Sequence, residues 1–289
     1  MFQIGTTVTF RYKSDSESAV RLRLAICVLV SLLGGALVVA PGVARADGCV
    51  DATTGFDCDF AARLARVQKY VESRPGYTGV AVSDGWRDRV WRNEYADRPI
   101  YAASTAKLAI ALDILMRRHR GEVQLSTDDW RWLYAALVSS DNGAANHLWN
   151  RYGGASMVDR WKDYGMTETG FVPGLERHWG SMKTTAADLR RLVRYVVRET
   201  PSEVRRYLMA RMRGVADNQQ WGVWSAGSGW VRGNKNGWFR YRAGWVLNSV
   251  GWVGAHQRYL VAVMADQRSR GTYASGVETT SEVARILFA

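Results

Sequence analysis

The stretch Ala103-Ser104-Thr105-Ala106-Lys107-Leu108 opens a run of residues with helical spacing and contains the only Ser-x-x-Lys sequence in the chain. Residues three apart share one face of a helix, so this spacing puts the Lys107 amine within reach of the Ser104 hydroxyl. An ordinary lysine has a pKa of about 10.4, and it accepts a proton only where burial or a neighbouring cation lowers that value. The stretch therefore predicts a serine nucleophile that depends on a lysine and on a second cation nearby.

Two further short motifs follow along the chain. Ser140-Asp141-Asn142 lies where one predicted helix ends and the next begins, and all three residue types are also favoured as helix N-caps. Lys235-Asn236-Gly237 lies in a strand-like run and is followed by Trp238. Each motif alone is a weak signal, but their order along the chain is specific.

In this order the three motifs resemble the signatures of class A β-lactamases and penicillin-binding proteins, and the resemblance covers roughly residues 59–287. The resemblance implies a serine hydrolase that acts through a covalent acyl-enzyme. In that mechanism Ser104 attacks an acyl carbon, Lys107 takes part in removing its proton, and Ser140 passes a proton to the leaving nitrogen.

The resemblance also implies residues that orient the reaction. Asn142 positions the Lys107 amine and the amide of the substrate, and Asp141 braces the turn between the two helices. Lys235 attracts the carboxylate of the substrate and polarises the Ser140 hydroxyl.

A third group of implied residues lies on the predicted strand. Gly237 lets the substrate backbone lie against the strand edge, as in strand addition. The backbone amides of Ser104 and Trp238 form the oxyanion hole.

The chain departs from the family pattern at two places. Asn236 stands where the family usually has threonine or serine. The sequence Phe-Val-Pro-Gly-Leu-Glu at 171–176 aligns with a loop that carries a glutamate in β-lactamases, and Val172 falls at that glutamate. Because the glutamate activates the water that releases the acyl group, efficient β-lactamase turnover is not expected unless Glu176 or Glu168 replaces it.

Hydrophobic spacing predicts the order of the secondary structure. Helices are expected at 59–73, across 104–213 and at 276–287, and strands at 77–82, 90–95, 229–238, 244–252 and 259–265. The predicted fold is mixed α and β and β-lactamase/transpeptidase-like, with an antiparallel sheet flanked by N- and C-terminal helices plus an inserted all-helical domain. The sheet part comprises 59–103 and 214–289, the helical part comprises 104–213, and the active site is expected between them.

The N-terminal segment has the pattern of a secretory signal peptide. Arg21 and Arg23 precede an apolar run at 24–40, and Ala44-Arg45-Ala46 fits a cleavage site. We expect residues 1–46 to be removed, which leaves a catalytic domain at 47–289. A retained anchor is the alternative, but the run is shorter than the roughly 20 residues of a membrane-spanning helix. Because the first twenty residues are polar, translation is also compatible with a start near Val20.

Cysteine usage agrees with export. Cys27 lies inside the signal segment, so Cys49 and Cys58 are the only pair in the mature chain, and a short-loop disulfide is expected. Neither Cys27 nor Cys49 has the surroundings of a lipid attachment site. The histidines are scattered without ligand spacing, so we expect no metal and no organic cofactor.

The chain is basic. Removing residues 1–46 takes away five basic and two acidic residues, so the formal net charge falls from +12 to +9. A basic exported protein favours anionic wall polymers as partners, and export argues against nucleic acid. Since only six of the 39 basic residues are lysine, a composition skew toward arginine is the alternative explanation. The tryptophans between Trp221 and Trp252 are expected in the core, with a sugar- or peptide-binding groove as the alternative.

Two functions from different classes remain. The first is a secreted, wall-associated hydrolase that acts on β-lactams or on D-alanyl cell-wall peptides. The second is a non-catalytic cell-wall-binding protein that retains the fold, which the absent glutamate, Asn236 and Trp238 favour. Acylation of Ser104 would distinguish them.

Overall fold

The computed structural model describes residues 48–176 and 178–289. The predicted signal peptide, including its cleavage site, lies outside these residues. Cys49 and Cys58 form the expected disulfide at the start of the described chain. Among the described residues, no helix is long and apolar enough to span a membrane.

Five antiparallel strands form the central sheet, in the order β2-β1-β7-β6-β5. Their bounds are Tyr77–Asp84 for β1, Arg89–Arg92 for β2, Arg232–Tyr241 for β5, Gly244–Val253 for β6 and Tyr259–Asp266 for β7. The pairing of β1 with β7 joins the two sequence-distant parts of the sheet. The inserted helices therefore leave the sheet after β1 and β2 and return to it at β5.

Side chains of the central strands alternate between two buried faces. Val80 and Val82 face one hydrophobic cluster, whereas Ala81 between them faces the other. This period of two is the geometry of a strand, and apolar residues at every position indicate that both faces are covered. The sheet is therefore the middle layer of the domain.

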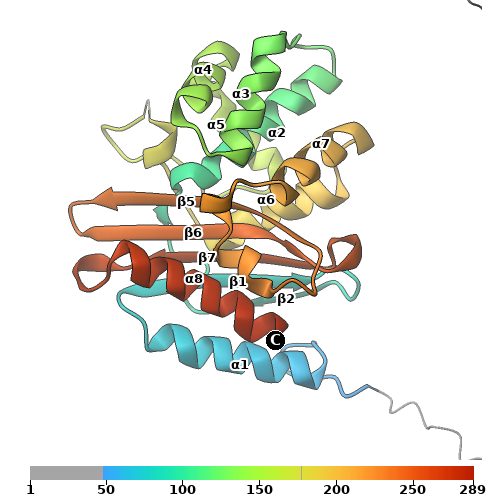
Figure 1. Cartoon of the computed structure of the whole chain (residues 1–289), viewed down its shortest axis with the longest axis vertical. Coiled ribbons are helices and arrows are strands. Elements are labelled where there is room, and N and C mark those ends of the chain that lie inside the picture. The colour runs from blue at the N-terminus through green and yellow to red at the C-terminus, as the bar shows by residue number, and fades with distance from the viewer. Residues whose placement is uncertain (1–47, 177) are drawn as a thin grey trace, which may run out of the picture. The chain divides into compact units, whose positions relative to one another are not determined.

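The terminal helices α1 (Cys58–Glu72) and α8 (Tyr273–Phe288) cover one face. Asp57 caps α1 by accepting a hydrogen bond from the Phe60 amide at 2.9 Å. Phe60, Leu64 and Val67 lie on the buried side of α1, in one cluster with residues of α8 and of the sheet. Figure 1 shows α8 crossing the sheet with α1 beside it.

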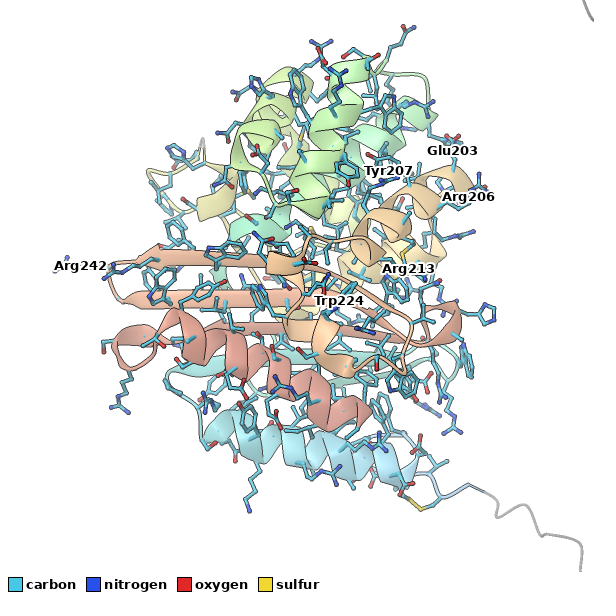
Figure 2. The ribbon with its side chains drawn as sticks, in the orientation of Figure 1. Glu203, Arg206, Tyr207, Arg213, Trp224 and Arg242 are labelled. Carbon is cyan, nitrogen blue, oxygen red and sulfur yellow. A yellow bond between two sulfur atoms is a disulfide. The ribbon has the colours of Figure 1, made fainter. Side chains whose placement is uncertain are left out.

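The other face carries the inserted helices, whose bounds are Ala106–His119 for α2, Thr127–Val138 for α3, Asn142–Tyr152 for α4, Met157–Trp161 for α5, Ala186–Arg198 for α6 and Ser202–Arg213 for α7. Every residue of α2 from Ala106 to Met116 is buried, so α2 is the central helix of this part. The ring of Tyr207 on α7, which is labelled in Figure 2, lies 5.2 Å from that of Trp130 on α3.

The predicted fold class, with its antiparallel sheet, terminal helices and inserted helical part, is confirmed. One feature was not predicted, because its elements are two residues long and show no periodicity. The short strands β3 (Ile100–Tyr101) and β4 (Lys183–Thr184) pair with each other and tie the segment before Ser104 to the segment before α6.

Candidate active site

Ser104 lies in a short 3-10 turn, Ala103–Thr105, that leads directly into α2. One turn later Lys107 points back along the same face, and its Nζ lies 2.9 Å from Ser104 Oγ. The Lys107 side chain is buried. The spacing of the motif therefore produces the predicted contact between hydroxyl and amine.

The loop between α3 and α4 completes the environment of Lys107. Lys107 Nζ donates to the Ser140 carbonyl oxygen at 2.5 Å and to Asn142 Oδ1 at 2.8 Å, and Ser140 Oγ lies 3.3 Å away. Asp141 caps α4 by accepting from the Ala144 amide at 2.6 Å. The capping interpretation thus holds for Asp141, while the residues on either side of it face Lys107.

Lys235 approaches from strand β5 on the other side of Ser140. Its Nζ lies 2.8 Å from Ser140 Oγ and 2.9 Å from the Asn236 carbonyl oxygen. A Cβ at Gly237 would lie 2.7 Å from the backbone nitrogen of Ser104, so only glycine permits this approach of β5 to the turn. Two amines, two hydroxyls and the strand edge are thereby brought together.

Both lysines are buried without a counter-ion. Among the described residues, neither forms a salt bridge with a carboxylate. Burial lowers the pKa of Lys107 to about 7, although the nearby Asp141 carboxylate raises it. Burial and, secondly, the charge of Lys107 lower the pKa of Lys235. The pair therefore holds one proton more easily than two.

The backbone is left-handed at two non-glycine residues of the site. Ala103, directly before the nucleophile, has φ of 49°, and Ser140 has φ of 59°. Such a conformation costs an L-residue roughly 1–2 kcal/mol. Backbone strain of this kind clusters at functional sites, where the surrounding structure holds it in place.

Asn236 does not face the cleft. Its Nδ2 donates to the carbonyl oxygens of Gln219 and Trp221, and its Oδ1 accepts from Asn234 Nδ2 at 2.9 Å. Since residues of a strand alternate in direction, Asn234 and Asn236 point away from the side that Lys235 faces. The amide is therefore committed to internal hydrogen bonds.

A cleft of about 520 Å³ opens in front of Ser104. Ser140, Asn142 and Trp238 line it, and these are residues that the resemblance assigns to the site. Trp221 and Trp252 are buried, in agreement with a core assignment, whereas Trp238 is half-buried at the cleft. Of the six tryptophans from Trp221 to Trp252, these two fit the core interpretation, and Trp238 has a place at the site. The others do not lie in the core, since Trp224 and Trp245 are half-buried and Trp230 is exposed.

Trp179 is a cleft residue that the sequence reasoning missed. Its ring centroid lies 5.0 Å from Lys107 Nζ, and its Nε1 donates to Asn146 Oδ1 at 2.8 Å. Both Trp179 and Asn146 line the cleft. Trp179 lies in an irregular segment before α6 with no periodic pattern, so nothing in the sequence indicated where its ring would point.

The carboxylates considered as replacements for the loop glutamate lie elsewhere. Glu176 accepts from the Gly174 amide of its own loop at 2.7 Å, and this hydrogen bond lowers the pKa of Glu176. Neither Glu176, Glu168 nor Val172 lines the cleft. Among the described residues that line it there is no carboxylate at all.

A family model described as the β-lactamase enzyme family matches residues 130–289, which is more than half of the chain. This match includes the second and third motifs and begins after Ser104 and Lys107. Proteins named "Putative lipoprotein LppW" from Mycobacterium tuberculosis and Mycobacterium bovis are 26% identical over 212 residues, covering 65% of this chain. The chain spans about 64% of the length of these relatives.

Solved structures agree on the fold. A β-lactamase from Xanthomonas campestris superposes with a TM-score of 0.66 at 20% identity, covering 80% of this chain and 97% of that one. A class A β-lactamase reconstructed for the last common ancestor of Gram-negative bacteria gives 0.65 at 20% identity, with 78% and 98% covered. A β-lactamase from Desulfarculus baarsii superposes with a TM-score of 0.64 at 21% identity, covering 79% of this chain and 96% of that one.

Proposed function

Because the chain belongs to the β-lactamase enzyme family, we propose that it is an exported serine hydrolase that forms an acyl-enzyme on Ser104. The substrates are β-lactams or cell-wall peptides that end in D-alanine. The observation that carries the proposal is the 2.9 Å contact between Lys107 Nζ and Ser104 Oγ in a buried site without a counter-ion.

In the acylation step the Ser104 hydroxyl proton passes to Lys107 as Oγ bonds to the acyl carbon. The carbon–nitrogen bond then breaks, and Ser140 donates its proton to the leaving nitrogen. Ser140 Oγ is within 2.8 Å of Lys235 Nζ and 3.3 Å of Lys107 Nζ, so it can be reprotonated from this pair. Each transfer takes place over hydrogen-bond distances.

The proton balance of the two lysines supports these roles. A substrate carboxylate near Lys235 favours the charged form of that amine. Because the pair holds one proton more easily than two, this leaves Lys107 as the neutral amine that serves as the base. The Asn142 side chain, 2.8 Å from Lys107 Nζ, keeps the amine in place.

Release of the acyl group is expected to be slow. A water molecule that attacks the ester needs a general base, and no carboxylate lines the cleft in the described part of the chain. The Trp179 ring covers Lys107 from the cleft, which limits access of water to that amine. We therefore propose a long-lived acyl-enzyme and poor β-lactamase turnover.

The relatives and the N-terminal sequence together support a proposed location outside the cytoplasm. Their name, lipoprotein, fits a protein exported across the membrane, as does the signal pattern at 1–46. In this chain Cys49 is bonded to Cys58, so Cys49 is not a free thiol for lipid attachment. We propose that the mature domain works outside the membrane, where a basic protein can associate with anionic wall polymers.

Intact-mass spectrometry of the mature protein with benzylpenicillin tests the proposal, with Ser104→Ala as the matched control. We expect an adduct with the mass of the intact penicillin that persists for minutes and is absent in the control. An adduct that decays within seconds would contradict slow deacylation. No adduct would contradict acyl-enzyme catalysis on penicillins and favour the non-catalytic wall-binding protein.

A further inference from the structure

We propose that a groove between α7, the 3-10 helix η6 (Gly222–Ala226) and the start of β5 binds an acidic polysaccharide. The groove shares no lining residue with the cleft of Ser104. The proposal rests on the proposed location outside the membrane, and it gives the association with anionic wall polymers a defined place. It does not require that Ser104 is acylated.

Two tryptophans, two arginines and a segment of small residues line this groove, whose volume is about 310 Å³. Trp224 lies in η6 and Trp230 directly before β5, with Ser228 and Gly229 between them in the chain. Figure 2 shows Trp224 beside Arg213, the last residue of α7, on the face toward the viewer. Because Ser228 and Gly229 have little or no side chain, they leave room for a ligand next to the rings.

The protein holds Arg232, the second arginine, in place without neutralising it. Its Nη1 donates to the carbonyl oxygens of Gly227 at 2.7 Å and Trp230 at 3.1 Å, and its guanidinium carbon lies 4.7 Å from the centre of the Trp224 ring. Carbonyl oxygens and an aromatic face orient a guanidinium but leave its charge. Within the described chain these hydrogen bonds use Nη1 alone, so Nη2 remains as a donor for a ligand.

The direction of Arg232 separates the groove from the chemistry of the cleft. Because the residues of a strand alternate in direction, Arg232 points to the same side of β5 as Asn234 and Asn236, away from the side that Lys235 faces. The two sites therefore use opposite sides of one strand.

Positive charge around the groove is not compensated. In the described part of the chain, Arg213 and Arg232 take part in no salt bridge, and the groove lining contains no Asp or Glu. Arg206 lies seven residues before Arg213, which is two turns or roughly 10 Å along the same face of α7. Both are exposed and point away from α7 in Figure 2. Cations repeated along a surface fit a polymer with repeated negative charges better than a single small anion.

Aromatic rings beside these cations narrow the kind of polymer. The apolar C–H face of a sugar ring packs on a tryptophan ring, and a guanidinium binds a carboxylate or phosphate through parallel hydrogen bonds. An acidic polysaccharide offers both groups, and it is a polymer found outside the membrane. The sugar-binding alternative for the tryptophans from Trp221 to Trp252 thus applies to Trp224 and Trp230.

Isothermal titration calorimetry of the mature protein with polygalacturonate tests the groove, since every sugar of this polymer carries a carboxylate. The methyl ester of the polymer has the same sugars without the charge and is the matched ligand. We expect the acid to bind about tenfold more tightly than the ester, through charge-assisted hydrogen bonds. The affinity for the acid should fall as the salt concentration rises from about 50 to about 200 mM. Equal affinity for acid and ester would overturn the proposal.

Arg213→Gln should weaken binding of polygalacturonate about fivefold, the effect of an exposed ion pair. Arg242→Gln is the matched control, because it removes the same charge from an exposed position in the turn after β5, away from Arg213 and Trp224 in Figure 2. Trp224→Leu should weaken binding about tenfold through the lost ring surface, with thermal unfolding as the check that this variant folds. Equal losses in Arg213→Gln and Arg242→Gln would show general charge attraction and overturn the groove.

Two other polyanions test the assignment to a polysaccharide. Tighter binding to single-stranded oligothymidylate, or to vesicles of phosphatidylglycerol, than to polygalacturonate would overturn it in favour of a nucleic acid or a membrane surface. Labelling of Ser104 by benzylpenicillin is measured on the same samples. Normal labelling without polygalacturonate binding would overturn the groove alone, whereas binding without labelling would support the groove and overturn the proposed acyl-enzyme.

Discussion

Two lysines at the cleft and two arginines of the scaffold lie in opposite electrostatic environments. In the scaffold, Arg160 on α5 binds the buried Asp113 of α2 through two hydrogen bonds of 2.7 and 2.8 Å. Arg258 binds Asp84 at the end of β1 at 2.7 Å. Beside the cleft, Lys107 and Lys235 are more deeply buried than either arginine, and their hydrogen bonds go to neutral oxygens.

The difference separates stability from chemistry. A buried carboxylate is tolerated in the scaffold because an arginine compensates its charge, and each such pair joins two elements. Burying an amine without compensation costs stability, since desolvation opposes its charged form. The cleft has two such amines side by side, so one can accept a proton from Ser104 while the other holds a charge for the substrate.

The largest effect is expected at Lys107, the proposed general base. Lys107→Met should lower the rate of Ser104 acylation about 1,000-fold, as loss of a general base does. In the wild type, acylation should rise with pH through about 7, because the deprotonated amine is the active form. Stopped-flow kinetics with benzylpenicillin between pH 5.5 and 9 measures both, and a flat wild-type profile would contradict the role of Lys107.

On the scaffold side, Asp113→Asn should lower the free energy of unfolding by about 3 kcal/mol, because it leaves Arg160 without its charge partner. Tyr164, whose hydroxyl also donates to Asp113, loses part of its partner as well. Urea unfolding measures the loss. Arg131→Gln, which breaks an exposed pair with Asp128, is the control and should leave stability unchanged. Equal stability of the two variants would mean that burial does not distinguish these pairs.

Lys235→Met should reduce acylation by carboxylate-bearing penicillins about 30-fold, the value of a charged hydrogen bond. The methyl ester of the same penicillin provides the contrast, since it offers no carboxylate. We expect wild type and variant to react with the ester at rates within a few-fold of each other. An equal loss with acid and ester would show that Lys235 acts through Ser140 and not on the substrate carboxylate.

The smallest effect is expected at Trp179, whose ring lies against Lys107. Trp179→Ala should admit water to the amine, which relieves desolvation and moves the midpoint of the acylation profile upward by about one pH unit. Trp179→Phe keeps an apolar ring while removing the hydrogen bond to Asn146, so its midpoint should remain near 7. An unchanged profile in Trp179→Ala would show that the ring does not control the solvation of Lys107.

Local spacing along the chain was sufficient to predict the positions of the motif residues in the cleft. Ser104 and Lys107 meet because they are three residues apart on a helix, and an asparagine after a helix N-cap is held at a defined place. The positions of Trp179 and Asn146 depend on how an irregular segment folds over α4, which no short-range pattern encodes. Strands β1 and β7 were predictable because apolar and β-branched residues dominate them. Strand β5, which is polar in its first half, begins and ends three residues after the predicted 229–238. The two-residue strands β3 and β4 were too short to show a period.

The left-handed backbone at Ala103 and Ser140 lowers the stability of the fold at the place where the site is built. Glycine relieves the strain at either position, so Ala103→Gly would make the fold more stable by up to about 1 kcal/mol. The packing around the start of α2 and the start of α4 therefore holds two backbone conformations that the residues there would not adopt on their own.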